Sequence, residues 1–560
     1  MDIQFFQDRY PPSIPKTVDV NQYSSVVEIF NKFVQKYAER PAFTCLGQTM
    51  TYAELNAQSA AFAAYLQNET SLVTGDRIAV QLPNVLQYPI VVFGAMRAGM
   101  IVVNTNPLYT EREMEHQFND SGAKALVVLA NMGDKAANVV PKTGIKHVFV
   151  TQVGDMHGTV KRLLINTVLK HVKKEVPEFS IAGAVPLRQA LNHGTGKQYT
   201  PVAATAEDVA VLQYTGGTTG VAKGAMLTHG NLMANMMQSH GVFNHVIDEA
   251  NEVLICPLPL YHIYAFTVHC MVLLETGNHN ILIPNPRDIP GFIKTLQKIE
   301  FTGFVGLNTL FVALCAQQDF RALNFSKLKL TVSGGMALTK SAFDEWRNVT
   351  GCDVAEGYGM TETSPVVSFN PSDNIKQGSI GMPVPNTNCK VIDDDGNDLP
   401  LGEAGELCVK GPQVMKGYWQ RPEATAETIT KDGWLKTGDV AVIGDDGYMK
   451  IVDRKKDMII VSGFNVYPNE VEDIIVSHPD IIEAAAIGIP DVKSSEAVKV
   501  FAVRSDPSLT EKDVIDYARQ NLTGYKVPRY IEFRDELPKT NVGKILRREL
   551  RDEELKNHPQ

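Results

Sequence analysis

Short runs of apolar and β-branched residues alternate along the chain with longer amphipathic stretches. Four runs have the length of buried strands: residues 78–82, 125–129, 147–150 and 303–307. Two stretches have the apolar spacing of helices: residues 52–66 and 290–299. Alternation of this kind predicts an α/β fold with mainly parallel sheets flanked by helices.

The pattern changes after residue 376. Two turn sequences, Asp394-Asp395-Gly396-Asn397 and Gly444-Asp445-Asp446-Gly447, punctuate short apolar runs. We therefore predict an antiparallel, β-rich subdomain at about 376–452, closing an N-terminal body of residues 1–453. After a charged run, residues 454–560 predict a small, mobile α+β domain with a hinge near 453–457, since a tail of about 100 residues can form a domain.

Residues 160–176 combine apolar positions at helical spacing with five interspersed cations. The cations are Lys161, Arg162, Lys170, Lys173 and Lys174. Two interpretations remain open: a surface helix that packs its apolar stripe on its own domain, or an interfacial helix on anionic lipid.

Size and composition narrow the class of protein. At 560 residues the chain is too long for a single core, and 44% hydrophobic with 21% charged residues is ordinary globular material. A formal net charge of −10 argues against nucleic acid as a partner. The seven cysteines show no C-x-x-C pair, so we expect reduced thiols in a cytoplasmic protein. No signal peptide or apolar run of membrane-spanning length is evident.

The most informative segment follows a strand-like run and concentrates glycine, threonine and lysine. It reads Tyr214, Thr215, Gly216, Gly217, Thr218, Thr219, Gly220, Val221, Ala222, Lys223, Gly224. Backbone N–H groups of such a loop can approach an anion closely, hydroxyls add donors and a lysine neutralises charge. Because Ala222 precedes Lys223, the segment does not fit the common G-x-x-x-x-G-K-[ST] loop. We interpret it as a polyphosphate site, most simply for ATP; a flexible surface loop is the alternative.

This segment resembles the phosphate loop of the adenylate-forming enzymes, the superfamily of acyl-CoA synthetases, luciferases and peptide-synthetase adenylation domains. Six further blocks follow in the order typical of that superfamily: residues 257–262, 333–336, 358–362, 433–439, 453–456 and 538–545. The resemblance covers nearly the whole chain and is closest to bacterial long-chain fatty acid:CoA ligases.

The resemblance implies a role for each matching residue of the nucleotide site. Residues 215–220 and Lys223 would hold the β- and γ-phosphates, and Gly335 and Gly359 would let backbone approach the nucleotide closely. Tyr358 would stack on adenine, Thr361 would touch the α-phosphate, and Glu362 with Thr215 would bind Mg²⁺. Asp439 would accept from the ribose hydroxyls, with Arg454 beside it. A lone Tyr-Gly-x-Thr-Glu sequence could also be a turn with a solvated glutamate.

The same resemblance makes Lys544 the catalytic lysine, steadying charge as a carboxylate attacks the α-phosphorus. Without its context, Lys544 would be read as a solvated surface charge. Lys456 falls at the hinge position about which the small domain turns between the two half-reactions. Five tail cations could dock the phosphates of coenzyme A or simply keep helices soluble: Lys526, Arg529, Arg547, Arg548 and Arg551.

On the acyl side, the resemblance places His262 near the substrate carboxylate. Phe266 either gates a fatty-acyl tunnel or is an ordinary core aromatic. Lys436 departs from the family pattern, where many fatty-acyl members carry histidine, and this weakens any claim about chain length.

The implied reaction activates a long-chain fatty acid with ATP, through acyl-AMP, to acyl-CoA, releasing AMP and pyrophosphate. Two alternatives stay open: an adenylation enzyme that loads an aryl or fatty acid onto a carrier protein, and a nucleotide-binding protein without activity. Peripheral contact with the cytoplasmic membrane face and a homodimer are also left open by the sequence.

Overall fold

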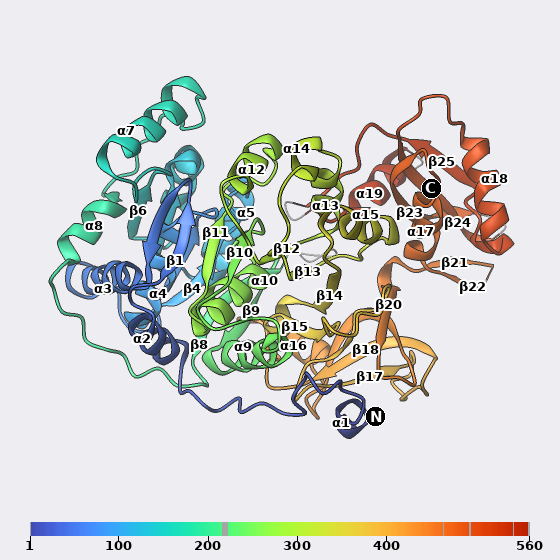
Figure 1. Ribbon diagram of the computed structural model, residues 1–560, viewed down its shortest axis with the longest axis horizontal. Coiled ribbons are helices and arrows are strands. Elements are labelled where there is room, and N and C mark those ends of the chain that lie inside the picture. Colours follow the sequence, from blue (N-terminus) through green and yellow to red (C-terminus); the bar gives the residue numbers. More distant parts are fainter. Residues whose placement is uncertain (1, 216–221, 463, 492–493, 541–542, 558–560) are drawn as a thin grey trace.

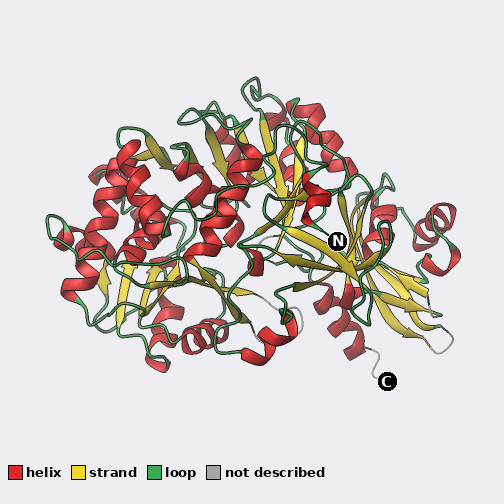
Figure 2. Ribbon diagram, turned by 90° about the horizontal axis from the view of Figure 1, so that it is seen from below, coloured by secondary structure: helices red, strands yellow, loops and turns green. Residues whose placement is uncertain are grey.

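The computed structural model describes residues 2–215, 222–462, 464–491, 494–540 and 543–557. Two large sheets flanked by helices and one four-stranded sheet make up the body, and a five-stranded sheet lies in a C-terminal lobe beside it (Figure 1). Figure 2 shows helices on the outside of the sheets of the body. The predicted fold class is confirmed.

The first large sheet has seven strands, with three of the four predicted strands at its centre. Its order is β7 (Val185–Pro186), β6 (His147–Thr151), β5 (Ala125–Leu129), β3 (Arg77–Gln81), β4 (Ile101–Asn104), β8 (Val209–Thr215), β9 (Lys223–Thr228). All neighbours are parallel except β8 and β9. The predicted helix at 52–66 is α3 (Tyr52–Glu69), which begins with a Thr51 capping box and packs against α4 (Gln87–Arg97).

The second large sheet has nine strands and carries much of the candidate site. Its order is β16 (Met382–Pro383), β15 (Val366–Phe369), β14 (Val354–Gly359), β13 (Leu330–Gly334), β12 (Gly303–Gly306), β10 (Val253–Cys256), β11 (His279–Leu282), β1 (Pro41–Cys45), β2 (Gln48–Thr51). The strands from β14 to β1 run parallel. Ligands bind at the carboxyl ends of such strands, and here β13 leads into Gly335 and β14 into Thr361.

Helices of the body that carry cleft-lining side chains include α5 (Glu111–Ser121), α9 (His229–Phe243), α13 (Asn308–Cys315) and α15 (Lys340–Thr350). The predicted helix at 290–299 corresponds to α12 (Ile289–Leu296), whose first turn is capped by Asp288.

The β-rich part is a four-stranded antiparallel sheet joined by both predicted turns. Its strands are β17 (Asn388–Ile392), β18 (Ala404–Lys410), β19 (Leu435–Ile443) and β20 (Met449–Arg454). The sheet starts later than residue 376, because β16 pairs with β15 and so belongs to the nine-stranded sheet. Near the other end of the chain, the short helix α1 (Ile3–Gln7) buries Phe6 in the core of this β-rich sheet.

The C-terminal lobe has its own sheet and its own core. It contains β21 (Ile459–Val461), β22 (Phe464–Val466), α17 (Pro468–Val476), β23 (Ile481–Asp491), β24 (Ser495–Arg504), α18 (Glu511–Asn521), β25 (Tyr530–Phe533) and α19 (Arg547–Asn557). One cluster of buried side chains there draws only on residues from Ile459 to Ile531. A separate core is what an independently moving unit needs. The boundary at 453/454 stays a prediction.

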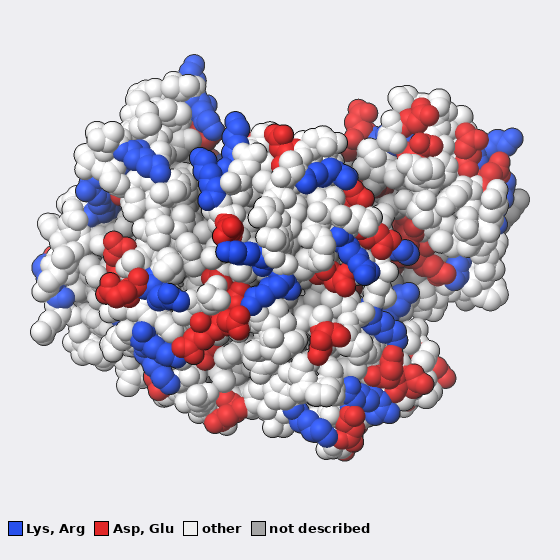
Figure 3. Space-filling model, in the orientation of Figure 1, with Lys and Arg blue, Asp and Glu red and all other residues white. Residues whose placement is uncertain are grey.

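The amphipathic segment forms α7 (Thr159–Thr167) and a following π-helical turn, Val168–Val172. Its apolar side chains face solvent: Val160 is 83% exposed, Leu163 59%, Leu164 62% and Val172 72%. The expectation that the stripe packs on its own domain is therefore wrong for these four side chains. In Figures 1 and 3 the segment projects at the upper left, where cations flank uncharged surface.

Candidate active site

A large cleft runs between the body and the C-terminal lobe and brings most predicted site residues together. They are Tyr214, Thr215, Lys223, His262, Gly335, Tyr358, Gly359, Thr361, Glu362, Asp439, Arg454, Lys456 and Lys544. These side chains come from both large sheets, the β-rich sheet and the small lobe, so only the tertiary fold assembles them.

The predicted phosphate loop joins two paired strands of the first sheet. Thr215 ends β8 and lies opposite Lys223, which begins β9. Six residues of the predicted set, Gly216, Gly217, Thr218, Thr219, Gly220 and Val221, lie outside the described residues. The Tyr214 hydroxyl donates to Asp120 at 2.7 Å, and the Ala222 carbonyl lies 3.1 Å from His116 Nε2, so both residues fasten the arms of the loop to α5.

Glu362 lies in a short 3-10 turn after β14 and is 7% exposed. Burial raises the pKa of its carboxyl, while the Tyr418 hydroxyl, donating at 2.7 Å, opposes that shift. The turn is tight: a Cβ on Gly359 would lie 2.0 Å from the Pro365 carbonyl oxygen, so only glycine fits. A buried carboxylate beside a phosphate site is a hard oxygen donor that suits Mg²⁺.

Asp439 on β19 is 6% exposed and is held from two sides. Tyr358 donates its hydroxyl to Asp439 Oδ2 at 2.6 Å, and Arg454 Nε lies 3.2 Å from Oδ1. Asp439 and Arg454 are also register partners across β19 and β20. The three side chains therefore form one polar wall of the cleft. Hydroxyl groups of a bound ribose would have to share the Asp439 carboxylate with Tyr358 and Arg454.

Lys544 reaches this wall from the small lobe. Its backbone N–H donates to Thr540 Oγ1 at 3.1 Å, while Thr540 donates its own N–H to the Lys544 carbonyl at 2.7 Å. Gly335 of the body has a left-handed φ of 87°, and a Cβ there would come within 3.9 Å of Lys544 Cε. The pKa of Lys544 is lowered to about 8, chiefly by burial and then by the charge of Arg454, whereas Asp439 and Glu362 oppose the shift. The lobes are therefore placed so that the lysine faces the acidic groups of the body.

His262 caps the short helix α10 (Ile263–Ala265), and its Nδ1 accepts from the Tyr264 N–H at 3.4 Å. Its pKa is lowered to about 4, chiefly by burial and then by the charge of Lys544. A neutral imidazole can donate a hydrogen bond to a carboxylate without carrying charge of its own.

Comparisons with known proteins agree with this geometry. Residues 30–419 match the family model described as AMP-binding enzyme, and residues 470–544 match the AMP-binding enzyme C-terminal domain. The chain belongs to the AMP-binding enzyme family. The predicted membership of the adenylate-forming superfamily is thereby confirmed.

Relatives of this AMP-binding enzyme match it over nearly their whole length. A long-chain-fatty-acid–CoA ligase of Escherichia coli O6:H1 is 53% identical, covering 98% of this chain and 97% of the relative. A protein of the same name from Haemophilus influenzae is 52% identical over 100% of both chains. The crystal structure of ATP-bound MatB from Rhodopseudomonas palustris superimposes with a TM-score of 0.81 at 30% identity, covering 94% of this chain and 98% of that one.

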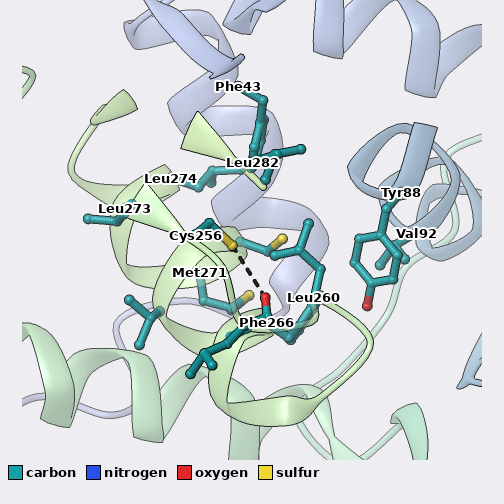
Figure 4. Close-up of a cluster of buried hydrophobic side chains, with 14 of the residues drawn as sticks. Phe43, Tyr88, Val92, Cys256, Leu260, Phe266, Met271, Leu273, Leu274 and Leu282 are labelled. Atoms are coloured by element: carbon teal, nitrogen blue, oxygen red, sulfur yellow. Dashed lines mark hydrogen bonds between the residues drawn. The ribbon is translucent and has the colours of Figure 1, made fainter. Parts of the chain in front are cut away.

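The contacts bear on two sets of residues for which the sequence left alternatives open, Phe266 and the tail cations. Phe266 is fully buried among core side chains that include Leu260, Met271 and Leu274 (Figure 4). It is not among the residues that line the described cleft. The described position therefore fits the core-aromatic alternative, and a gating role would require the ring to move.

The tail cations are engaged within the small lobe and at its junction with the body. Lys526 pairs with Glu470, Arg529 with Asp491, Arg548 with Asp552, and Arg551 with Asp457. Arg547 binds Glu472 through two nitrogens. Sequence composition showed the cations but not their acidic partners, so docking of coenzyme A on any of the five would first require an ion pair to open.

Tyr418 was missed by the sequence-based prediction. It lies after β18, and besides binding Glu362 its ring sits 5.1 Å from Lys223 Nζ. The same loop pairs with β9, since Trp419 donates its N–H to the Gly224 carbonyl at 2.8 Å. Tyr418 thus joins the predicted metal ligand to the predicted phosphate lysine. The Gly-Tyr-Trp sequence gave no chemical signal that could have pointed to it.

Proposed function

We propose that this protein activates long-chain fatty acids with ATP and joins them to coenzyme A through an acyl-AMP intermediate, releasing AMP and pyrophosphate. One observation carries the proposal: Lys544 of the small lobe lies against Gly335 and within electrostatic reach of Asp439 and Glu362. The full-length similarity to long-chain-fatty-acid–CoA ligases supports the choice of acid and acceptor.

Each side chain takes the role that the family resemblance implies, and its place in the cleft supports that role. Asp439 accepts from the ribose, Tyr358 lies beside adenine, and Lys223 and Thr215 face the β- and γ-phosphates. As the carboxylate oxygen attacks the α-phosphorus and pyrophosphate leaves, Lys544 steadies the negative charge on the oxygens around phosphorus. The thiol of coenzyme A then attacks the acyl carbon, and AMP leaves with the bonding electron pair.

Glu362 would hold Mg²⁺, with Thr215 as a second oxygen donor. Among the described residues no group of three or more His, Cys, Asp or Glu side chains could hold a metal ion by itself. That fits Mg²⁺, which usually takes one or two protein ligands and completes its shell with substrate phosphates and water. The metal would supply charge neutralisation for the leaving pyrophosphate.

Apolar side chains also line the cleft and suit a hydrocarbon chain. They include Val242 and Phe243 of α9, Val268, Val366 and Phe369. Each CH₂ buried there contributes about 0.8 kcal/mol, so selectivity between neighbouring chain lengths should be gradual until the apolar surface ends.

The decisive experiment is AMP release across a panel of acids, with coenzyme A present or omitted. We expect palmitate with coenzyme A to exceed acetate and benzoate by orders of magnitude. Preference for a short or aryl acid would overturn the acyl assignment. AMP release that needs an acyl carrier protein in place of coenzyme A would establish the carrier-loading alternative.

We also propose that the exposed α7 stripe rests on an anionic bilayer surface. Val160, Leu163, Leu164 and Val172 supply the apolar contact, and Arg162, Lys170 and Lys174 would face lipid phosphates. Lys161 donates to the Leu46 carbonyl and Lys173 lies 3.8 Å from Glu175, so these two cations would have to exchange partners at the membrane. No helix in the described part of the chain is long and apolar enough to cross a membrane. The fatty acid substrate partitions into bilayers, so a docked enzyme would meet it there.

Flotation with phosphatidylglycerol vesicles tests this surface. Leu163→Ser with Leu164→Ser, or neutralisation of the five cations, should abolish co-flotation while palmitate activity in detergent stays unchanged. Binding to phosphatidylcholine vesicles should be weak throughout. Equal flotation of the variants and the unaltered protein would reject the assignment.

A further inference from the structure

The strand that leads to the predicted hinge carries a carboxylate that is closed off from water. Asp453, on β20, is 0% exposed, and burying a charge is costly unless it is paired. Its Oδ2 accepts the Asn469 N–H at 2.7 Å, and its Oδ1 accepts the Arg454 N–H at 2.7 Å. Arg547 Nη1 lies 3.5 Å from Oδ1. Two of these three donors belong to the C-terminal lobe.

Asn469 adds a second bond across the same junction, because its Nδ2 donates to the Val452 carbonyl at 3.2 Å. Its side-chain oxygen accepts from Arg547 Nη2. Arg547 in turn holds Glu472 of α17 at 2.8 Å and 2.6 Å. The result is a connected polar cluster in which the start of α17 and the start of α19 both meet the end of β20.

The groups of this cluster lie on both sides of the predicted hinge in the sequence. Val452 and Asp453 precede Lys456, whereas Asn469, Glu472 and Arg547 follow it. A turn of the lobe about Lys456 would separate Asp453 from Asn469 and Arg547. The Arg547–Glu472 contact would survive, since both partners move together. The bonds to Asp453 therefore belong to this one arrangement of the lobes, in which Lys544 faces Asp439 and Glu362.

We propose that Asp453, Asn469 and Arg547 form a clasp that holds the small lobe in the adenylating arrangement and opens when the lobe turns for thioester formation. These are positioning residues, acting through Lys544 on the reaction. The inference rests on the proposed function and on the hinge at Lys456. Burial raises the pKa of Asp453 to about 6 even beside Arg547. The partners of Asp453 therefore only just offset the cost of burying its charge. A contact of this kind suits a junction that must open in every cycle.

The test separates the two half-reactions. Asp453→Asn keeps the shape but weakens the charge-assisted bonds that Asp453 accepts, and should lower palmitate-dependent ATP–pyrophosphate exchange ~10-fold. Thioester formation from supplied palmitoyl-AMP and coenzyme A should be unchanged or faster. Asn469→Ala should act in the same direction but less, because the backbone bond to Asp453 remains. Arg519→Gln is the matched control, since it removes only the exposed pair with Asp516 on α18 of the same lobe.

Trypsin provides a readout that does not depend on activity. Cleavage after Arg454, Lys455 or Lys456 should be several-fold faster in Asp453→Asn than in the unaltered protein or Arg519→Gln. Equal loss of both half-reactions, or unchanged exchange together with unchanged cleavage, would overturn the clasp. If the unaltered protein shows no exchange with any fatty acid, the proposed function fails, and the cleavage comparison alone still decides whether the clasp exists.

Discussion

The large body and the C-terminal lobe are held together internally by apolar packing, but they meet through polar contacts. The body has an extensive core that joins both large sheets, and the lobe has a separate one. At their junction lie the ion pairs of Arg547 and the hydrogen bonds of Asp453. Apolar surfaces that separate expose themselves to water, whereas polar groups exchange one set of hydrogen bonds for another. The difference shows how one chain can keep a rigid nucleotide site and still move a catalytic group.

The largest effect should come from removing Lys544, the side chain through which the mobile lobe acts on the rigid nucleotide site. Lys544→Ala should lower pyrophosphate exchange by about 10²–10³-fold, the usual cost of losing a group that stabilises transition-state charge. Thioester formation from palmitoyl-AMP should change much less. Lys539→Ala, which removes a surface pair with Glu483 from the same turn, is the control. Full exchange activity in Lys544→Ala would refute the proposed role.

The next largest effect should come from stiffening the junction. Lys456→Pro fixes φ at the predicted hinge and restricts the preceding residue, so it should impair thioester formation by about tenfold or more while adenylation changes little. The measurement compares single-turnover rates of the two half-reactions. Lys456→Ala should leave both rates near those of the unaltered protein, and an equal decrease in Lys456→Pro would argue against the hinge.

A smaller effect is expected within the rigid body, where Tyr418 braces Glu362. Tyr418→Phe removes one buried hydrogen bond but keeps the ring near Lys223, so kcat/KM for MgATP should fall ~10-fold, with a higher Mg²⁺ requirement. Melting temperature reports whether the fold is intact. An unchanged Mg²⁺ dependence would show that the hydroxyl does not position Glu362.

The last prediction is a pH dependence. The Lys544 cation is present below its pKa of about 8 and is lost above it, so kcat/KM for ATP in pyrophosphate exchange should be level below pH 8 and fall at higher pH. The decrease should approach tenfold per pH unit. Omitting coenzyme A keeps its thiol from contributing, and Lys544→Ala should lose this dependence. A flat profile to pH 10 would contradict the lowered pKa.

Much of the site was predictable because phosphate chemistry leaves a dense signal in sequence. Thr215, Lys223, Tyr358, Glu362, Asp439 and Lys544 all line one cleft, as the order of the motifs implied. Tyr418 was not predictable, because a tyrosine acquires its role only from the carboxylate and the lysine that the fold places beside it. The ion pairs of the tail cations were not predictable either, because four of the five cations have partners that lie tens of residues away in the sequence.

The sequence alone determined the alternation of strands and helices, both tight turns and the chemistry of the phosphate and lysine motifs, because these depend on periodicity and on neighbouring residues. Only the tertiary structure decided whether an apolar side chain packs in the core or faces solvent. Helical spacing described both Phe266 and the α7 stripe as apolar, yet the first is buried and the second faces solvent. Periodicity gives the direction of a side chain, whereas burial, pairing and the approach of Lys544 to the body depend on segments far apart in the chain.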